Sequence, residues 1–315
     1  MSNRLLLDKS YDLYLSMTWP PNTDHGVSGH IYEIIDYYLL LKDHLKVGIA
    51  ICENMTWKQF RSIIVSKYNV SDSELTEIEH STVFHPRPKI LRGNNVLFVD
   101  GGIKNCLHAH GVLLFFNHIF SFRCAKEDTH HDLIYKNLTL LQDNRVYSDE
   151  DNNIAIDYKK RIKFDSYNDV AQTRTNTALL YLTKNCRLLS DGDIIDVIRT
   201  YDYENYMILT STPKEHKSRF ANHDNLHFPA MPVDNIFEKF DTYIYTPTKG
   251  SADCSPRFIA ECKHYGKEII YHNIDESYLD RDPGLKYRRY DIENDFDSVN
   301  LKPDDDIIDI LHERI

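Results

Sequence analysis

The stretch DCSPRFIAECKHYGKEIIY, from Asp253 to Tyr271, predicts a loop, a helix and a strand in that order. Ser255 is a suitable N-cap, because its hydroxyl can accept a hydrogen bond from a first-turn N–H that has no helical partner. Pro256 fits the first helical position, where its missing N–H costs nothing. Gly266 fits the left-handed residue that commonly follows a helix. A loop, a capped helix and the short strand KEIIY together form half of an α/β unit.

The predicted helix has two faces. The apolar face carries Phe258, Ile259, Cys262 and Tyr265, and the polar face carries Arg257, Glu261 and His264. On a polar face, Glu261 could be replaced at little cost in stability. The N–H groups at the start of such a helix favour a phosphate or a carboxylate. The alternative is an ordinary packing helix with a surface Arg257–Glu261 pair.

The composition indicates a globular protein. With 315 residues, the chain can form two domains of about 150 residues each. Hydrophobic residues make up 42% of it, too many for a disordered chain. Neither the apolar run GVLLFF nor the N-terminal MSNRLLLDKSYD predicts a transmembrane segment or a signal peptide. The six cysteines include no CxxC pair, so we expect reduced thiols, a cytoplasmic location and no metal site.

The net charge of −11 is unevenly distributed. Residues 1–175 carry 20 Lys and Arg against 22 Asp and Glu, a net −2, whereas residues 176–315 carry 17 against 26, a net −9. An acidic chain argues against non-specific nucleic-acid binding as the main role. The near-neutral first half contains a locally basic loop, HPRPKILRGNN (His85–Asn95), that could contact a phosphate backbone.

Both halves of the chain repeat the pattern of strand, helix and strand. The first half predicts strands at 12–19, 46–52, 95–102 and 111–117, and helices at 31–45 and 56–68. After a polar hinge at 165–177, the second half predicts strands at 177–185 and 204–212, a helix at 191–201, a helix running into a strand at 235–248 and a terminal helix at 302–315. Such units place their strands in parallel. We therefore expect an α/β fold with two Rossmann-like domains, at 1–170 and 171–300, and a C-terminal helix at 301–315.

The segment FPAMPVDNIFEKFDTYIYTPTKGSADCSPRFIAECKHYGKEIIY (228–271) resembles the nucleotide-sugar-binding half of GT-B glycosyltransferases. In that family, an acidic residue in a loop is followed eight positions later by a second one on the next helix. Asp253 and Glu261 have this spacing. The resemblance implies a fold of the GT-B type, in which two Rossmann-like domains face a central cleft. The domain at 1–170 would bind the acceptor, and the domain at 171–300 would bind the nucleotide sugar.

The resemblance also implies roles for the donor-binding residues. Glu261 would accept hydrogen bonds from the ribose hydroxyls of the donor, and Asp253 would hold hydroxyls of the transferred sugar. The backbone N–H groups near Ser255, Arg257 and Phe258 would face the diphosphate.

Two cations near the end of the strand at 177–185 complete the expected donor site. Lys184 and Arg187 stand where the family commonly places phosphate-binding cations, which would stabilise the charge on the departing diphosphate. The alternative is an exposed loop pair without a ligand.

The first half offers candidates for an acid–base role at its predicted strand ends. His25 follows the first strand, Asp100 follows a later buried strand, and His118 follows a third. An inverting transfer needs a base within reach of the acceptor hydroxyl, and we expect Asp100 or His25 to serve. A retaining transfer would need no such base, and both residues would then position substrates or cap turns.

We therefore expect a glycosyltransferase, either a hexosyl- or a pentosyltransferase, that uses a UDP-sugar donor and needs no cofactor. Two acceptors stay open: a modified (hydroxymethylated) base in phage DNA, and a surface saccharide. The basic loop at His85–Asn95, beside Trp57, Lys58 and Arg61, would favour DNA. A non-catalytic nucleotide-binding protein is the alternative outside transfer chemistry.

Overall fold

The computed structural model divides the chain into two compact units. It describes residues 4–17, 22–23, 26–27, 29–52, 55–85, 90–99, 113–115, 117–123, 138–143, 153–156, 161–171, 174–182, 191–210, 212–230, 233–245, 257–272 and 306–315. Unit 1 comprises Met1–Asn168 with Leu301–Ile315, and unit 2 comprises Asp169–Asn300. The acceptor- and donor-binding roles expected for the two halves stay predictions.

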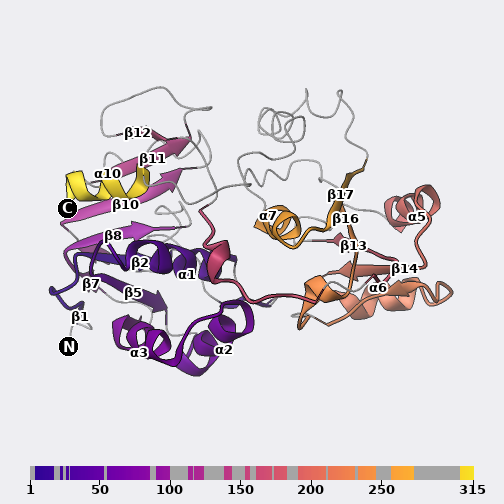
Figure 1. Cartoon of the computed structure of the whole chain (residues 1–315), viewed down its shortest axis with the longest axis horizontal. Helices are drawn as coiled ribbons and strands as arrows, with labels where there is room; N and C mark the ends of the chain where they lie inside the picture. Colours follow the sequence, from indigo (N-terminus) through magenta and orange to yellow (C-terminus); the bar gives the residue numbers. More distant parts are fainter. Residues whose placement is uncertain are drawn as a thin grey trace. The chain divides into compact units, whose positions relative to one another are not determined.

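Unit 1 is built on a seven-stranded sheet in which every pairing is parallel (Figure 1). Its strands in chain order are β2 (Leu13–Ser16), β5 (Val47–Cys52), β6 (Thr82–His85), β8 (Asn95–Phe98), β10 (His118–Arg123), β11 (Leu138–Asp143) and β12 (Asn153–Ile156). The order across the sheet is β12-β11-β10-β8-β2-β5-β6. The first strand of the sheet, β2, therefore lies between the second and the fourth, as in a Rossmann fold.

The helices of unit 1 begin at local sequence signals. α1 (Gly29–Leu41) packs against β2 and β5. α2 (Trp57–Lys67) and α3 (Asp72–Ser81) each begin with a capping box, formed by Thr56 with Gln59 and by Ser71 with Glu74. In each box, the N-cap hydroxyl accepts from the backbone of the third helical residue, whose side chain accepts in return from the N-cap N–H.

Unit 1 contains two further small sheets. The strands β1 (Arg4–Leu6), β7 (Ile90–Arg92) and β9 (Leu113–Phe115) form a three-stranded parallel sheet, and β3 (Asn22–Thr23) pairs with β4 (Gly26–Val27) in an antiparallel ladder. The strand predicted at 111–117 is confirmed as β9, which pairs in the three-stranded sheet and not in the main sheet. The basic stretch at His85–Asn95 is also not a single loop, because strands β6, β7 and β8 take up part of it.

Unit 2 is a smaller sheet of five parallel strands, with the order β15-β14-β13-β16-β17. The strands are β13 (Thr177–Tyr181), β14 (Asn205–Leu209), β15 (Leu226–His227), β16 (Thr242–Tyr245) and β17 (Glu268–Tyr271). Among its described residues, the helices are α5 (Asp191–Thr200), α6 (Pro213–Arg219) and α7 (Arg257–His264), with short 3-10 turns at Phe164–Ser166 (η2) before unit 2 and Ile236–Glu238 (η4) within it. In chain order the strands lie as 3-2-1-4-5, which is again the Rossmann order.

Hydrogen bonds hold the segment that joins the two units at each of its ends. On the unit 1 side, the Asn168 N–H donates to the Lys67 carbonyl at 2.8 Å. On the unit 2 side, the Thr175 N–H donates to a carboxylate oxygen of Asp241 at 2.8 Å. The predicted hinge at 165–177 is therefore hydrogen-bonded to unit 1 near its start and to unit 2 near its end.

The C-terminal helix α10 (Asp306–Arg314) belongs to unit 1, although it follows unit 2 in the chain (Figure 1). Ile307, Ile308 and Leu311, which recur at helical spacing, are buried. The helix therefore completes the apolar core of unit 1.

Candidate functional site

The strand order of unit 2 determines where a ligand can bind. β13 pairs with both β14 and β16, so the direction of winding changes between β13 and β16. In open α/β sheets, ligands bind outside the carboxyl ends of the strands at such a switch point. β13 ends at Tyr181 and β16 ends at Tyr245, so these two residues mark the edge of the candidate site.

The first turn of α7 lies against this edge. The ring of Phe258 contacts the ring of Tyr181, at the end of β13, with a centroid distance of 5.3 Å, and the ring of Tyr243, on β16, at 5.0 Å. Phe258 also stacks with Phe237 and Phe240. Of these rings, that of Tyr181 lies at the carboxyl end of a strand, so the contact between Tyr181 and Phe258 places the first turn of α7 at this edge.

Arg257 and Glu261 form a buried ion pair on α7. The Arg257 Nε lies 2.7 Å from Glu261 Oε1, and the side chains are only 11% and 5% exposed. Glu261 shares a face with Arg257, as expected, but this face is buried, so the expected surface position of the pair is wrong. Ile259, Ala260 and Cys262 are also buried, so neighbouring segments cover more of the helix than its apolar stripe.

The end of α7 has the predicted geometry. Gly266 has φ 65°, the Lys267 N–H donates to the Cys262 carbonyl, and the Gly266 N–H donates to the Lys263 carbonyl. These two bonds form a Schellman motif, which satisfies carbonyls that lack a helical partner. The left-handed conformation predicted for Gly266 is confirmed.

Cys262 is a structural residue of this helix. It is fully buried, and burial raises the pKa of its thiol, so the sulfur stays neutral. Among the described residues, no group of three or more His, Cys, Asp or Glu side chains could hold a metal ion.

A polar cluster at the end of β17 carried no signal in the sequence. His272 Nδ1 lies 3.2 Å from the Tyr201 hydroxyl, and His272 Nε2 lies 3.4 Å from an oxygen of Asp196 on α5. His272 is buried, whereas Asp196 is exposed. The cluster ties α5 to the edge strand of the sheet.

A hollow of about 540 Å³ lies at the opposite edge of the unit 2 sheet, next to the first residues of its strands. It is lined by Arg174, Thr175, Asn176, Tyr203, Glu204, Asp241, Thr242 and Glu268. Parallel α/β sheets bind ligands at their carboxyl edge, so we place the candidate site at α7 and not in this hollow.

Unit 1 has a switch point of the same kind. β2 pairs with both β5 and β8, so the winding changes between β2 and β8. His118 is not at this edge, because it is the first residue of β10 and not a residue that follows a strand. One of its ring nitrogens instead lies 2.5 Å from the Thr139 hydroxyl, and burial lowers the pKa of its ring.

Comparisons with known proteins give a limited result. No family model matches the chain, and no curated protein sequence matches it. HepE from Anabaena, solved in complex with UDP and glucose, is similar in structure, with a TM-score of 0.44 and 10% identity over 82% of this chain and 79% of that chain. MurG from Acinetobacter baumannii is similar with a TM-score of 0.36 and 8% identity over 96% of this chain and 99% of that chain.

The main sheet of each unit determines the fold of that unit. Each of these two sheets is parallel and has the Rossmann strand order, and a C-terminal helix returns from the second unit to the first. The fold is therefore α/β, with two Rossmann-like units. The predicted α/β fold with two Rossmann-like units is thereby confirmed, whereas the cleft expected between them stays a prediction.

Most predicted site residues lie outside the described residues, namely Lys184, Arg187, Asp253, Ser255, His25 and Asp100. Their places in the chain are nonetheless informative. Residues 183–190 follow β13, and residues 246–256 join β16 to α7. The predicted donor-binding residues therefore belong to the segments that follow the two switch-point strands of unit 2.

The two predicted catalytic residues belong to unit 1. Asp100 comes two residues after the end of β8, whereas His25 comes nine residues after the end of β2, between β3 and β4. Of the predicted donor residues, the structure describes Arg257, Phe258 and Glu261, and it brings all three together on α7. Tyr181 was missed, because only the sheet topology places it beside Phe258.

No helix among the described residues has both the length and the apolar character needed to cross a membrane.

Proposed function

We propose that this protein is a glycosyltransferase that transfers a sugar from a nucleotide diphosphate donor, a UDP-sugar, to an acceptor hydroxyl. The observation that supports it most is the position of α7. Its first turn packs on Tyr181 at the switch point of unit 2, and Glu261 lies one turn later. Asp253 precedes Glu261 by the eight positions typical of the donor site in GT-B glycosyltransferases, which the segment at 228–271 resembles.

The residues of unit 2 would bind the donor. The N–H groups of the first turn of α7 would face the diphosphate, since a helix start favours anions. Glu261 would accept from the ribose hydroxyls, and Asp253 would hold the sugar. Lys184 and Arg187, which follow β13, would stabilise the charge that develops on the leaving diphosphate.

The residues of unit 1 would activate the acceptor. In the proposed reaction, the acceptor oxygen forms a bond to the anomeric carbon while the bond from this carbon to the diphosphate oxygen breaks. In an inverting transfer, the hydroxyl proton passes to a base. Asp100 and His25 are the candidates, because Asp100 comes just after the switch-point strand β8 and His25 belongs to the segment that joins the switch-point strand β2 to α1.

Nucleotide binding is the first test of this proposal. We would record thermal unfolding with UDP, GDP, ADP and CMP, and expect UDP to raise the unfolding temperature most. A ligand at one hundred times its Kd stabilises the folded state by about 2.7 kcal/mol. Glu261→Gln should reduce the shift, whereas Glu215→Gln, an exposed change on α6, should keep it. If none of the four nucleotides shifts the transition, the proposal is wrong.

The acceptor is the second test. UDP release from UDP-glucose would be measured with hydroxymethylated DNA and, separately, with polysaccharide fragments. A DNA acceptor predicts activity that falls steeply between 50 and 200 mM salt, because bound cations are released from the phosphate backbone. A saccharide acceptor predicts activity that hardly changes with salt. Lys58 and Arg61, which are exposed on α2, are the described cations to replace if DNA is active.

A further inference from the structure

The Arg257–Glu261 pair is buried, although an exposed pair would contribute as much to stability. Its spacing of four residues is that of an ordinary helix ion pair, which contributes little when it is exposed. Burial removes water from both charges, and this desolvation can exceed the attraction between them. Stability alone therefore gives no reason to bury this pair.

The pair fixes the carboxylate of Glu261 at the candidate donor site. Side chains on a helix lean toward its N-terminus, so the Glu261 carboxylate points back to the first turn, where Arg257 lies. The intervening Phe258 is held by Tyr181 and Tyr243. The backbone of the turn and the direction of the carboxylate are therefore both constrained.

We propose that Arg257 is a positioning residue, whose guanidinium holds the Glu261 carboxylate in the orientation that receives the ribose hydroxyls of a bound nucleotide diphosphate. This inference rests on the proposed function. An ionised carboxylate accepts about four hydrogen bonds, so the bond from Arg257 is compatible with bonds from two hydroxyls. The guanidinium also offsets the negative charge of Glu261 next to an anionic ligand.

The planar shape of the Arg257 guanidinium, and not only its charge, fixes the orientation of the Glu261 carboxylate. Arginine donates through a rigid fork, whereas lysine carries a single charge on a flexible stem. Arg257→Lys would keep a positive charge beside Glu261 but would no longer fix the direction of the carboxylate. Preorganised groups bind more tightly because less conformational freedom is lost on binding.

The test compares UDP with 2′-deoxy-UDP by titration calorimetry. Loss of a hydrogen bond to a charged group should weaken binding about tenfold to a hundredfold, so the wild type should prefer UDP by this ratio. Arg257→Met and Glu261→Gln should each bring the ratio close to one. The double variant should bring no further loss, because the two residues act as a unit.

A matched control is the exposed pair of Arg219 and Asp191, 3.0 Å apart with side chains 49% and 43% exposed. Arg219→Met should keep the wild-type ratio. If Arg257→Met is folded and also keeps it, the inference is wrong while the proposed function stands. If the wild type binds no nucleoside diphosphate, both are wrong.

Arg257→Met leaves a lone buried carboxylate and can fail to fold. Arg257→Lys then takes its place, because the ammonium still offsets that charge. A ratio close to one in the lysine variant supports the positioning role, and a wild-type ratio overturns it.

Discussion

Gly48 on β5 leaves space for the ring of Tyr14 on β2. The two residues are directly paired across the strands, and Tyr14 is fully buried. A Cβ at position 48 would stand 2.4 Å from Tyr14 Cε1. The ring cannot easily move away, because its hydroxyl donates to the Asp8 carbonyl at 3.0 Å.

Gly48→Ala should therefore destabilise unit 1 by about 1 to 3 kcal/mol, the usual cost of overpacking a core. Urea unfolding measures this change. Gly29→Ala is the matched control, because a Cβ there meets no atom within 4 Å. Equal stability of the two variants would show that Tyr14 repacks freely.

Gly266 is required for its backbone conformation and not for space. No atom lies within 4 Å of a Cβ built at this position, but its φ is 65°. Gly266→Ala should cost about 1 to 2 kcal/mol, because the left-handed region is strained for residues with a Cβ. Gly266→Asn should cost less, since asparagine tolerates this conformation. Equal losses for both variants in thermal unfolding would contradict the argument.

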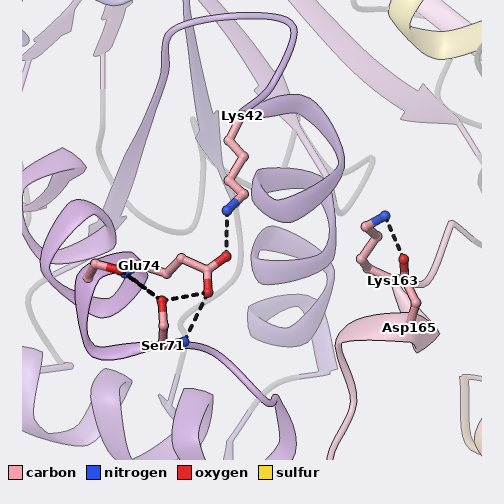
Figure 2. Close-up of polar contacts among 6 residues, drawn as sticks. Lys42, Ser71, Glu74, Lys163 and Asp165 are labelled. Atoms are coloured by element: carbon pink, nitrogen blue, oxygen red, sulfur yellow. Dashed lines mark hydrogen bonds and ion pairs between the residues drawn. The ribbon is translucent and has the colours of Figure 1, made fainter.

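The start of α3 depends on a charged capping box, shown in Figure 2. Glu74 binds the Lys42 ammonium at 2.6 Å and accepts from the Ser71 N–H at 2.9 Å. These two bonds, that from Lys42 first, lower the pKa of Glu74 from 4.5 to about 2. A carboxyl whose pKa is lowered by folding stabilises the protein fully above its unfolded pKa, and this stabilisation is lost as the pH falls toward 2.

Glu74→Gln should therefore be less stable than the wild type at pH 7, and the difference should shrink between pH 4.5 and pH 2. Urea unfolding at several pH values measures it. The box of α2 is the control, because Gln59 replaces the acid there. Thr56→Ala should cost about 1 kcal/mol at every pH. A Glu74→Gln difference that stays constant down to pH 2 would contradict the role of the charge.

Two kinds of sequence pattern predicted elements correctly. Gly266 predicted the end of α7, and apolar residues at helical spacing predicted α1, α2 and α5. α3 was missed, although Ser71 and Glu74 have capping-box spacing. The strand at 111–117 was predicted but its sheet was not, because an apolar run indicates a buried strand but not the sheet in which it pairs.

The candidate site was predictable only in part. The spacing of Asp253 and Glu261 is visible in the sequence, and so is the apolar stripe of α7. The burial of Glu261 is not, because periodicity identifies one covered face, whereas α7 buries the consecutive residues Ile259 to Cys262. Whether a second face is covered depends on segments that are distant in sequence.

At the scale of the whole molecule, the chain passes from unit 1 to unit 2 and back. α10 follows unit 2 in sequence but belongs to unit 1, where Leu311 and Ile307 are fully buried. Unit 1 therefore cannot complete its core until the chain beyond unit 2 has been made. Each unit keeps its own apolar core, and that of unit 2 includes Ile194, Ile208 and Ile244.

Leu311→Ala should consequently destabilise unit 1 alone, by about 2 to 5 kcal/mol, the range for a truncated buried leucine. Both tryptophans, Trp19 and Trp57, belong to unit 1, so tryptophan fluorescence follows the unfolding of that unit. Calorimetry records both units, and only the transition that coincides with the fluorescence change should move to lower temperature. Glu313→Ala, on the exposed side of α10, should leave it in place. A shift of the whole calorimetric profile in Leu311→Ala would instead mean that the two units unfold as one, because a core defect in unit 1 would then reach unit 2.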